Sequence, residues 1–377
     1  MAHGQDIKRI VILTQNYFPL IGGITTWCYE YARAFRDMGF EVVVVAPGPA
    51  GLPPDPDEGF RIIRLSDRNW KTRKNYRIYG AIKHLINRET VFLCANWKMA
   101  VPCMMHSLHH RIRYFTAVHG LDAFERRAIN RRIQHLAFAR GDGIIPVSRY
   151  TLDLMQPFNI APHKYRVVNN GVDLGKFPLL PRDPATEAKY GFGDEFRLIS
   201  ISRIDIRKGF DMTIRALPFV NKPLVYYIAG EGKYKLELER IIAELDLADR
   251  VKFIGFVPDE ELAAVYTCGD LFSMPSRRYK NSVEGFGIVY LEAAACGVPS
   301  IAGRNSGAED AVLNGETGFL VDPQSPEDIA AAINRAIEDR ELLNRMRTRG
   351  RSRVEQFFTW EYLATQMLDF MRERLAP

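Results

Sequence analysis

Short, almost unbroken runs of aliphatic residues recur along the chain, separated by segments with the 3.6-residue period of an amphipathic helix. The first run covers residues 9–14 and precedes a turn with Gly22 and Gly23, a helical pattern over 25–38 and a second run over 41–46. Strands covered by helices on both faces carry such continuous Val and Ile runs, whereas strands with one face in water alternate. The start of the chain therefore predicts a strand, a helix and a second strand of a parallel sheet.

The runs fall into two series with an irregular stretch between them. Residues 178–193 hold three prolines and two glycines without apolar periodicity, which predicts a linker that we place at 179–195. We expect an N-terminal domain over 1–178, a C-terminal domain over 196–356 and a last helix within 357–377 that packs back toward the N-terminal domain. Further strands are expected at 91–94, 114–118, 143–147, 165–168, 196–202, 224–229, 251–254, 271–274, 299–302 and 318–321, and further helices at 234–245, 259–268, 328–337, 342–357 and 360–375.

This order predicts two Rossmann-like, doubly wound α/β domains that face a central cleft. In open parallel sheets, ligands bind at the carboxyl ends of the strands, so we expect the site in that cleft.

Length and composition suit a soluble protein of two domains. The chain has 377 residues, of which 47% are hydrophobic and 25% charged, as is ordinary for globular proteins. Its five cysteines are far apart and form no Cys-x-x-Cys pair, which favours a reducing compartment over a disulfide or metal framework. Residues 1–5 are polar and no apolar run is long enough to span a bilayer, so we expect a cytoplasmic protein without a secretory leader.

Positive charge is concentrated in the first half of the chain. Residues 1–190 hold 27 Lys and Arg against 16 Asp and Glu, whereas the remainder holds 24 against 29. Residues 61–88 alone carry nine basic side chains and one acid, interleaved with Trp70, Tyr76 and Tyr79. Basic residues beside aromatic ones suit attachment to an anionic membrane surface, and a solvated basic face has the same composition. No nucleic-acid-binding motif accompanies the charge, so we expect no nucleic-acid partner.

The most specific local pattern is the segment Glu284-Gly-Phe-Gly-Ile-Val-Tyr-Leu-Glu292, followed by Ala-Ala-Ala-Cys-Gly-Val-Pro. A glycine turn that opens a helix presents free backbone N–H groups to an anion. The carboxylates at both ends of the segment can accept hydrogen bonds from hydroxyl groups. Helical acids usually face water, but Glu292 lies among Leu and Ala residues, where a buried acid needs a partner. An anion flanked by hydroxyl groups describes a sugar nucleotide.

Two cations precede this segment in the second series. Arg203 follows an expected strand, and Lys208 stands five residues later in the same strand-to-helix loop. Together they could neutralise a diphosphate, or they could be surface charges of a solvated loop. Phe256 and Val257 follow the next strand but one, where backbone groups could meet the edge of a base.

In this order the motifs resemble those of the retaining glycosyltransferases of family 4 (glycosyl transferases group 1), which have the two-domain GT-B fold. The resemblance covers nearly the whole chain, and the Glu-x7-Glu segment with its tail is its most specific part. The other matching motifs are Asn16-Tyr-Phe-Pro19 with Gly22-Gly23-Ile24, Val118-His119-Gly120, Val147-Ser148, Asn169-Asn-Gly-Val-Asp173, Ser202-Arg203 with Lys208-Gly209, Gly230-Glu-Gly232, Ile254-Gly-Phe256 and Met274-Pro-Ser276.

The resemblance implies a role for each matched residue. Glu284 would hold hydroxyl groups of the donor sugar, and Glu292 would bind those of the nucleotide ribose. Arg203 and Lys208 would grip the diphosphate and stabilise it as it leaves, so no metal ion or other cofactor is expected. The implied backbone contacts are those of Gly285, Phe286, Gly287 and Ile288 with the sugar and diphosphate, of Phe256 and Val257 with the base, and of the loop with Gly22 and Gly23 with the phosphate.

His119 would contact the donor sugar or act on the acceptor side. Many relatives carry an acid directly after this histidine, whereas this chain has Gly120, which puts a role as base in question. A second departure is Asn305-Ser306-Gly307, where relatives often have paired glycines.

The resemblance implies a retaining, metal-independent transfer of a hexose, of mannose or glucose type, from a nucleotide diphosphate sugar to a glycan or glycolipid hydroxyl. Residues 273–289 look most like members that use GDP-mannose, including phosphatidylinositol mannosyltransferases, and a UDP-sugar stays open. The basic half favours a peripheral position on the inner face of the plasma membrane. The sequence fixes neither the acceptor and linkage nor the oligomeric state.

The sequence also bears on three other functions. A NAD-dependent dehydrogenase needs Gly-x-Gly-x-x-Gly after its first strand, and the loop over residues 15–23 lacks it. A sugar-nucleotide epimerase or phosphorylase on the same fold stays open. A non-catalytic membrane- or glycan-binding protein is disfavoured by the intact set of Arg203, Lys208, Glu284 and Glu292.

Overall fold

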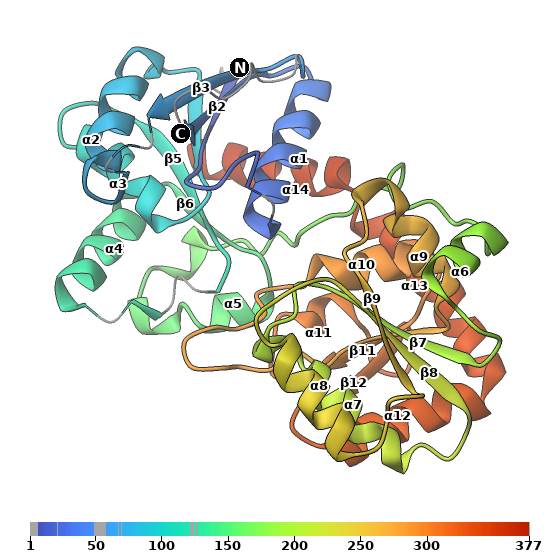
Figure 1. The fold of residues 1–377 in the computed structure, drawn as a ribbon. Coiled ribbons are helices and arrows are strands. Elements are labelled where there is room, and N and C mark those ends of the chain that lie inside the picture. The colour runs from blue at the N-terminus through green and yellow to red at the C-terminus, as the bar shows by residue number, and fades with distance from the viewer. Residues whose placement is uncertain are drawn as a thin grey trace. The chain divides into compact units, whose positions relative to one another are not determined.

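The computed structural model describes residues 7–20, 22–48, 58–66, 68, 70–120, 124–125 and 127–376, and it divides into two compact units (Figure 1). Unit 1 comprises Met1–Asn170 together with Trp360–Pro377, and unit 2 comprises Gly171–Thr359. The chain therefore passes between the units twice. We describe each unit by itself.

The described residues of unit 1 form a six-stranded sheet in the order β3-β2-β1-β4-β5-β6, with every pair parallel. The strands are β1 (Arg9–Leu13), β2 (Glu41–Gly48), β3 (Arg61–Ser66), β4 (Thr90–Cys94), β5 (Arg113–Val118) and β6 (Gly143–Pro146). The helices are α1 (Gly23–Asp37), α2 (Trp70–Ile82), α3 (Trp97–His106), α4 (Ala128–Arg140), α5 (Arg149–Asp153) and α14 (Trp360–Leu375).

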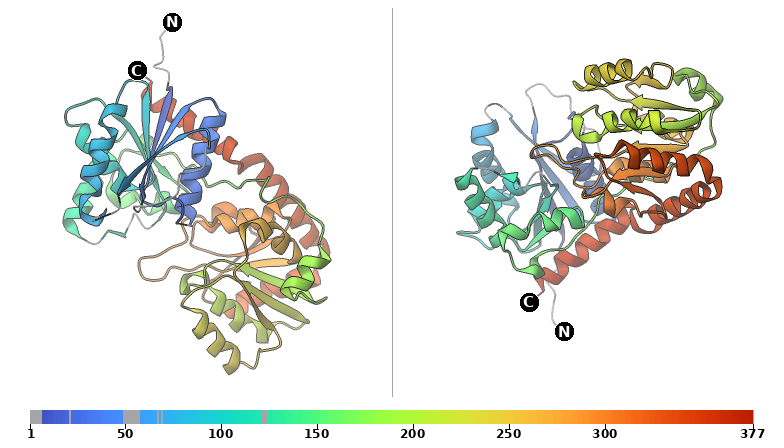
Figure 2. Two further views of the ribbon diagram at one scale, coloured as in Figure 1. Left: turned by 45° about the horizontal axis from the view of Figure 1, so that its top comes forward. Right: turned by 90° about the horizontal axis from the view of Figure 1, so that it is seen from below.

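Both faces of the unit 1 sheet are covered, which explains the unbroken apolar runs. Ile10 and Ile12 of β1 pack in the core under α1 and α14, whereas Val11 and Leu13 pack in the core under α2 and α3. Successive side chains of a strand point to opposite faces, so a strand buried on both faces must be apolar throughout. Figure 2 shows these two helix pairs on opposite sides of the sheet.

Unit 2 repeats this architecture. Its described residues form a six-stranded parallel sheet in the order β12-β11-β10-β7-β8-β9. The strands are β7 (Phe196–Ile201), β8 (Leu224–Ala229), β9 (Val251–Gly255), β10 (Leu271–Met274), β11 (Ser300–Gly303) and β12 (Gly318–Val321). The helices are α6 (Pro184–Tyr190), α7 (Phe210–Ala216), α8 (Lys235–Glu244), α9 (Leu262–Cys268), α10 (Ile288–Ala295), α11 (Ala308–Ala311), α12 (Pro326–Glu338) and α13 (Arg340–Phe357).

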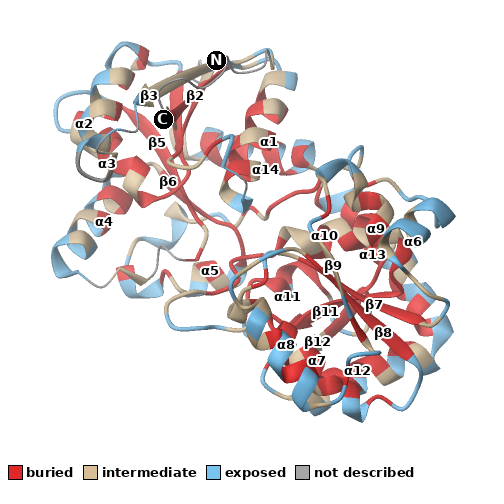
Figure 3. Ribbon diagram, viewed as in Figure 1, coloured by how far each residue is buried: buried red, intermediate tan, exposed pale blue. Residues whose placement is uncertain are grey.

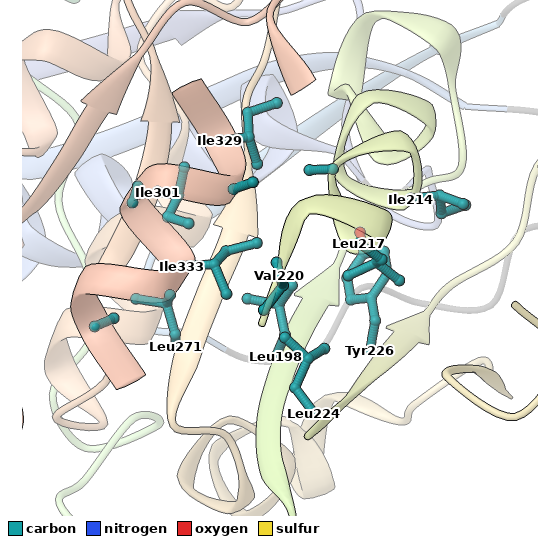
Figure 4. Close-up of a cluster of buried hydrophobic side chains, with 14 of the residues drawn as sticks. Leu198, Ile214, Leu217, Val220, Leu224, Tyr226, Leu271, Ile301, Ile329 and Ile333 are labelled. Atoms are coloured by element: carbon teal, nitrogen blue, oxygen red, sulfur yellow. The ribbon is translucent and has the colours of Figure 1, made fainter. Parts of the chain in front are cut away.

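The largest apolar cluster of unit 2 joins the sheet to the helices on one of its faces. Leu198 of β7 and Leu271 of β10 lie in it beside Ile214 of α7 and Ile333 of α12 (Figure 4). This cluster fixes the position of the strand ends from which the site loops leave.

In each sheet the strand order reverses at one point, between β1 and β4 in unit 1 and between β7 and β10 in unit 2. Loops that leave two such neighbouring strands in opposite directions open a crevice, and ligands of doubly wound sheets bind there. The architecture of two doubly wound domains predicted from the sequence is confirmed.

Most expected elements are found within a residue or two of their predicted bounds, with one exception in unit 1, where strand β3 and helices α2 to α5 are additional to those expected. Residues 165–168 are not a strand: the N–H groups of Arg166 and Val168 donate to the carbonyls of Ile144 and Pro146 in β6, but only Tyr165 forms a bridge, with Ile144. Strand β3 was not expected, because basic residues interrupt its apolar run. As an edge strand it is only partly buried, in contrast to the interior strands (Figure 3).

The stretch expected to be a linker contains a helix. Asp183 accepts hydrogen bonds from the N–H groups of Ala185 and Thr186, and Pro184 occupies the first turn of α6. Asp followed by Pro is a helix-start signal, which the absence of apolar periodicity conceals because α6 buries no residue. The units divide at Asn170 and Thr359, whereas the sequence placed the divisions at 178 and 356.

Candidate active site

The strand order of the unit 2 sheet reverses between β7 and β10. The loops that follow these two strands are in direct contact. The first loop contains a 3-10 turn, Ile206–Lys208, whose entry is capped by the Asp205 carboxylate. Gly209 follows with φ of 80°, and a Cβ atom there would lie 2.2 Å from the carbonyl oxygen of Pro275 in the second loop. Only glycine allows this backbone conformation and this close approach. The glycine brings the cations of one loop next to the acid of the other.

Glu284 lies at the centre of this contact. Its Oε2 atom accepts hydrogen bonds from Lys208 Nζ at 2.6 Å, Arg207 Nη1 at 2.7 Å and Ser276 Oγ at 3.4 Å. Its Oε1 atom accepts no hydrogen bond from any part of the chain that the structure describes. One carboxylate oxygen is therefore fixed by protein donors, and the other is available to a ligand.

The charges of this cluster hold Glu284 ionised. Burial alone would raise the pKa of Glu284, but the nearby Lys208 and Arg207 and their hydrogen bonds outweigh it and lower the pKa to about 2. The pKa of Lys208 is lowered, because burial and the neighbouring arginines outweigh the attraction of Glu284. The result is a buried carboxylate fixed between two cations.

The turn that follows Glu284 opens helix α10. Gly285, Phe286 and Gly287 are buried, and Gly287 adopts φ of 88° before the first helical residue, Ile288. No side chain caps this helix start. The Tyr290 N–H donates to the Gly287 carbonyl, and the amides before it in the first turn have no partner within the helix, so this N-terminus suits an anionic group.

Glu292 lies one turn further along α10 and is bound differently. Its Oε2 atom accepts a hydrogen bond from the hydroxyl of Tyr266 at 2.8 Å. Burial raises the pKa of Glu292 to about 7, against the lowering effect of the Tyr266 hydrogen bond. The two acids of the Glu-x7-Glu segment thus have different charge states, since Glu284 is ionised throughout the physiological range and Glu292 titrates within it.

The other residues predicted for unit 2 lie around these loops. Arg203 is exposed, and within the described residues its side chain forms no ion pair or hydrogen bond. Phe256, in the loop after β9, is 63% exposed, whereas Val257 beside it is buried. Arg203 therefore keeps its donors available, while the cation that joins Lys208 at Glu284 is Arg207.

The residues predicted for unit 1 follow its strands. Gly22 and Gly23 are exposed at the start of α1, and a Cβ atom at either position would meet nothing within 4 Å. His119 follows β5 and packs edge-on against Trp27, with ring centroids 5.3 Å apart. Burial lowers the pKa of His119 to about 4, against a hydrogen bond with the backbone of Ala95. This histidine is neutral at physiological pH.

The described residues bear on two further properties, metal binding and membrane crossing. Within them, no three His, Cys, Asp or Glu side chains form a cluster that could hold a metal ion. No helix in the described ranges has the combination of length and apolar content that crossing a bilayer requires.

Comparison with known proteins assigns the family. The family model described as Glycosyltransferase Family 4 matches residues 21–176, and the one described as Glycosyl transferases group 1 matches residues 183–353. The chain belongs to the family 4 glycosyltransferases. The resemblance stated from the motifs is thereby confirmed.

Three proteins similar to this glycosyltransferase are two mycobacterial enzymes and one crystal structure. It is 29% identical to the GDP-mannose-dependent alpha-(1-6)-phosphatidylinositol monomannoside mannosyltransferase of Mycobacterium tuberculosis, over 97% of this chain and 98% of that protein. The enzyme of the same name from Mycolicibacterium smegmatis is 37% identical over 54% of this chain and 55% of that protein. The crystal structure of Anabaena HepE in complex with UDP and glucose matches with a TM-score of 0.79 and 20% identity, over 97% of this chain and all of that one. This last likeness confirms the GT-B fold.

Sequence reasoning missed three residues of the glycosyltransferase's unit 2 site. Arg207 was overlooked although it precedes Lys208, because spacing alone does not show which of two neighbouring cations turns inward. Arg277 forms a two-pronged ion pair with Asp211 of α7, at 2.9 and 2.7 Å, and its N–H donates to the Arg207 carbonyl. Tyr266 was overlooked because its partnership with Glu292 joins two different helices.

Proposed function

We propose that this glycosyltransferase moves a hexose from a nucleotide diphosphate sugar to a hydroxyl of a glycan or glycolipid, with retention of anomeric configuration and without a metal ion. The observation that carries the proposal is the Glu284 carboxylate, whose Oε2 is fixed by Lys208 and Arg207 while Oε1 is left open. A buried carboxylate with one open oxygen is suited to accept hydrogen bonds from sugar hydroxyls. Its position beside the helix start of α10 places an anion-binding N-terminus next to it.

The cations suit a leaving diphosphate. The Lys208 ammonium has three N–H donors, of which one is directed to Glu284, so that others remain for phosphate oxygens. The exposed Arg203 guanidinium can add a two-pronged contact. Negative charge grows on the diphosphate as its bond to the sugar breaks, so fixed cations stabilise the transition state more than the bound donor. We propose that these cations perform the task for which other enzymes use a divalent metal.

Retention follows, in this proposal, from attack on the same face that the diphosphate leaves. The acceptor oxygen forms its bond to the anomeric carbon while the bond from that carbon to the phosphate oxygen breaks. The acceptor's proton passes to the departing phosphate oxygen. No enzymic base is required, which agrees with the ionised Glu284 being engaged by two cations and with the low pKa of His119.

We propose GDP-mannose as the first donor to test, because the mycobacterial relatives are named as GDP-mannose-dependent. The UDP and glucose in the HepE complex make a UDP-sugar the alternative. A thermal-shift panel with GDP, UDP and ADP separates these bases, since a bound nucleotide stabilises the fold by mass action.

We further propose a lipid-linked acceptor, which would place the protein on an anionic membrane surface. The support is the basic first half of the chain and the phosphatidylinositol-based acceptors in the relatives' names. Flotation with vesicles tests this: binding to anionic vesicles at low salt, lost at high salt or with neutral vesicles, is expected. Failure to float with anionic vesicles at low salt removes this part of the proposal.

The decisive experiment incubates the enzyme with donor, with and without candidate acceptors, in the presence of a metal chelator. An acceptor-dependent product whose anomeric configuration by NMR equals that of the donor is expected. Inversion would overturn retention, and activity restored only by added metal would overturn metal independence. Donor converted without acceptor would instead indicate the epimerase.

Variants connect this activity to the site. Lys208→Ala should lower kcat/KM by about a hundredfold or more, because a fixed cation at the leaving group is lost. Lys222→Ala, which changes an exposed lysine just before the amino end of β8, is the matched control. Equal activity of the two variants would remove Lys208 from the site.

A further inference from the structure

Unit 2 also contains a cavity at the ends of its strands opposite to the loops that hold Glu284. A cavity of about 430 Å³ is bounded by the segment around Leu180, the residues just before β10 and β11, and one face of α13. Gly269 and Val298 in its wall precede β10 and β11, so the cavity lies at the amino ends of the parallel strands. The residues around Glu284 lie at their carboxyl ends. The volume is within the range of small-molecule sites.

One wall of this cavity carries more positive than negative charge. Arg182 and Arg347, which line it, share a single oxygen of Asp270, at 2.8 and 3.2 Å, and Arg340 lies 4.0 Å from the same oxygen. The other oxygen of Asp270 accepts the backbone N–H of Arg197. One carboxylate thus serves three guanidinium groups, which leaves an excess of positive charge beside the cavity.

Donor capacity is also left over. The Nε atom of Arg347 is buried and makes no hydrogen bond with any described residue. A buried N–H without an acceptor costs about 1–3 kcal/mol, so an anionic group in the cavity would be bound by charge and by an unsatisfied donor together. Burial lowers the pKa of Arg347, and the neighbouring Arg182 and Arg340 lower it further, against the raising effect of Asp270.

The remaining lining combines apolar residues with polar ones, among them Glu355, whose carboxylate is paired with Arg351 at 2.6 Å. Leu179 and Leu180 are 62% and 39% exposed, and they face the same cavity as Val298 and the buried Cys296. Exposed leucines next to an electropositive wall favour a ligand with an apolar body and one anionic group over a bare anion.

The cavity also touches α9, which carries Tyr266, and the end of α10, which carries Glu292. Thr267 lines it and directly follows Tyr266, and Cys296 lines it and directly follows the last residue of α10. Arg351, another lining residue, donates to the carbonyl of Ala295 at the end of α10. Figure 1 shows α9, α10 and α13 gathered on one side of the unit 2 sheet. An occupant that engages Arg351 would therefore compete with its contact at the end of α10, the helix that carries Glu292.

We infer that this cavity binds a small soluble amphiphile, with one carboxylate or phosphate on a single short apolar chain, and that its occupation changes the affinity of the donor site for nucleotide. The anionic group lies against Arg347 and Arg182, and the chain lies against the leucines and Val298. The binding half of this inference is independent of the proposed transfer reaction, because it needs neither donor nor acceptor.

Calorimetric titration of the full chain with decyl phosphate, below its micelle concentration, tests the binding. We expect saturable binding of one molecule per chain, with inorganic phosphate and decanol each weaker by about tenfold or more because each supplies only half of the contacts. Arg347→Gln should weaken decyl phosphate binding by about tenfold, and Arg345→Gln, an exposed arginine on the same helix, by less than about twofold. Equal effects of these two variants, or binding of phosphate alone as tightly, would overturn the assignment.

Two further variants guard against misfolding and against binding at the donor site. Ser352→Trp should fill the cavity and abolish binding, while Ser352→Ala should leave it intact. Lys208→Ala should not affect decyl phosphate binding. Loss of decyl phosphate binding in this variant would mean that the probe occupies the donor site instead of the cavity. Titration of the nucleotide with and without decyl phosphate then tests the coupling. A change in nucleotide affinity of about threefold or more is expected, and an unchanged affinity would overturn the effector role.

Discussion

At the scale of single residues, the site depends on how buried acids are neutralised. Glu284 keeps its charge because Lys208 and Arg207 lie against one of its oxygens, whereas Glu292 has only the Tyr266 hydroxyl. Two acids eight residues apart thus acquire pKa values of about 2 and about 7. The difference arises from their partners, since the residue type is the same.

Replacing Glu284 by Gln keeps its shape and removes the charge. We expect kcat to fall about a hundredfold, through the loss of a fixed acceptor for the sugar, and the fold to lose about 3 kcal/mol, because two buried cations lose their partner. Steady-state kinetics and thermal unfolding measure the two effects. Glu316→Gln, an exposed acid paired with Arg349 at 3.7 Å, is the control that should change neither. Wild-type turnover in Glu284→Gln would contradict the assigned role.

We expect Glu292 to make nucleotide affinity and stability depend on pH in opposite directions. The ionised carboxylate is the stronger acceptor, because protonation turns one of its oxygens into a donor, so nucleotide affinity should rise as pH increases through about 7. The folded pKa is raised, so the stabilising contribution of the protonated form is present below the unfolded value and is lost as pH rises through 7. The wild type should therefore lose about 3 kcal/mol of stability relative to Glu292→Gln as the pH rises from 5 to 8. The Glu292→Gln variant should bind nucleotide weakly at both pH values.

Titrations and denaturant unfolding at the two pH values check this. Tyr266→Phe removes the hydrogen bond that lowers the pKa, so it should move the affinity transition to higher pH. A transition that stays in place would show that another group controls it.

At the scale of elements, glycines let the loops at the carboxyl ends of the strands pack backbone against backbone. Gly307, which precedes α11, has an ordinary helical φ of −65°, yet a Cβ atom there would lie 1.9 Å from the carbonyl oxygen of Gly285. Its N–H also donates to the Glu284 carbonyl at 2.9 Å. The glycine is therefore required by space alone, and it supports the turn that leads into α10.

Gly307→Ala should consequently displace that turn. We expect a loss of about 2 kcal/mol in the free energy of unfolding from overpacking, together with weaker donor binding. Gly80→Ala, at an exposed position of α2 where a Cβ atom meets nothing within 4 Å, should gain up to about 1 kcal/mol from helix propensity. Denaturant unfolding of both variants and the KM for donor measure this. A Gly307→Ala variant with wild-type KM would show that the turn tolerates the added methyl group.

At the scale of the whole molecule, the last helix of the chain completes the first unit. Helix α14 buries Trp360 and Phe370 in the core of unit 1, where Phe370 packs against Phe115 of β5 with ring centroids 5.7 Å apart. Residues from the two ends of the sequence thus share one apolar core. Removing either β1 or α14 would expose that core.

Phe370→Ala should therefore destabilise unit 1 and leave unit 2 unchanged. Truncating a fully buried aromatic side chain costs about 3 to 4 kcal/mol, and calorimetry should show one of two unfolding transitions moved to lower temperature. Asp369→Ala, which changes the exposed neighbour, should move neither transition. A shift of both transitions by equal amounts would show that the units unfold as one.

Much of the fold was predictable because a strand that is buried on both faces of a sheet has a continuous apolar run in its own sequence. The interior of a strand such as β2 is apolar without a break, from Val42 to Ala46, and β10, β12 and α14 begin and end where the sequence pattern places them. The edge strand β3 escaped prediction for the complementary reason, since partial burial tolerates the arginines that interrupt its pattern.

By itself the sequence determined the two doubly wound domains, the glycine turn into α10 and the acids at its ends, because these depend on local periodicity and on residue types at short spacing. Only the tertiary structure decided that Arg207 lies at Glu284, that Arg277 pairs with Asp211, and that Tyr266 binds Glu292. These partners are separated by 77, 66 and 26 residues. Their meeting depends on which side chains the packed strands and helices turn toward each other, and no spacing along the chain records that.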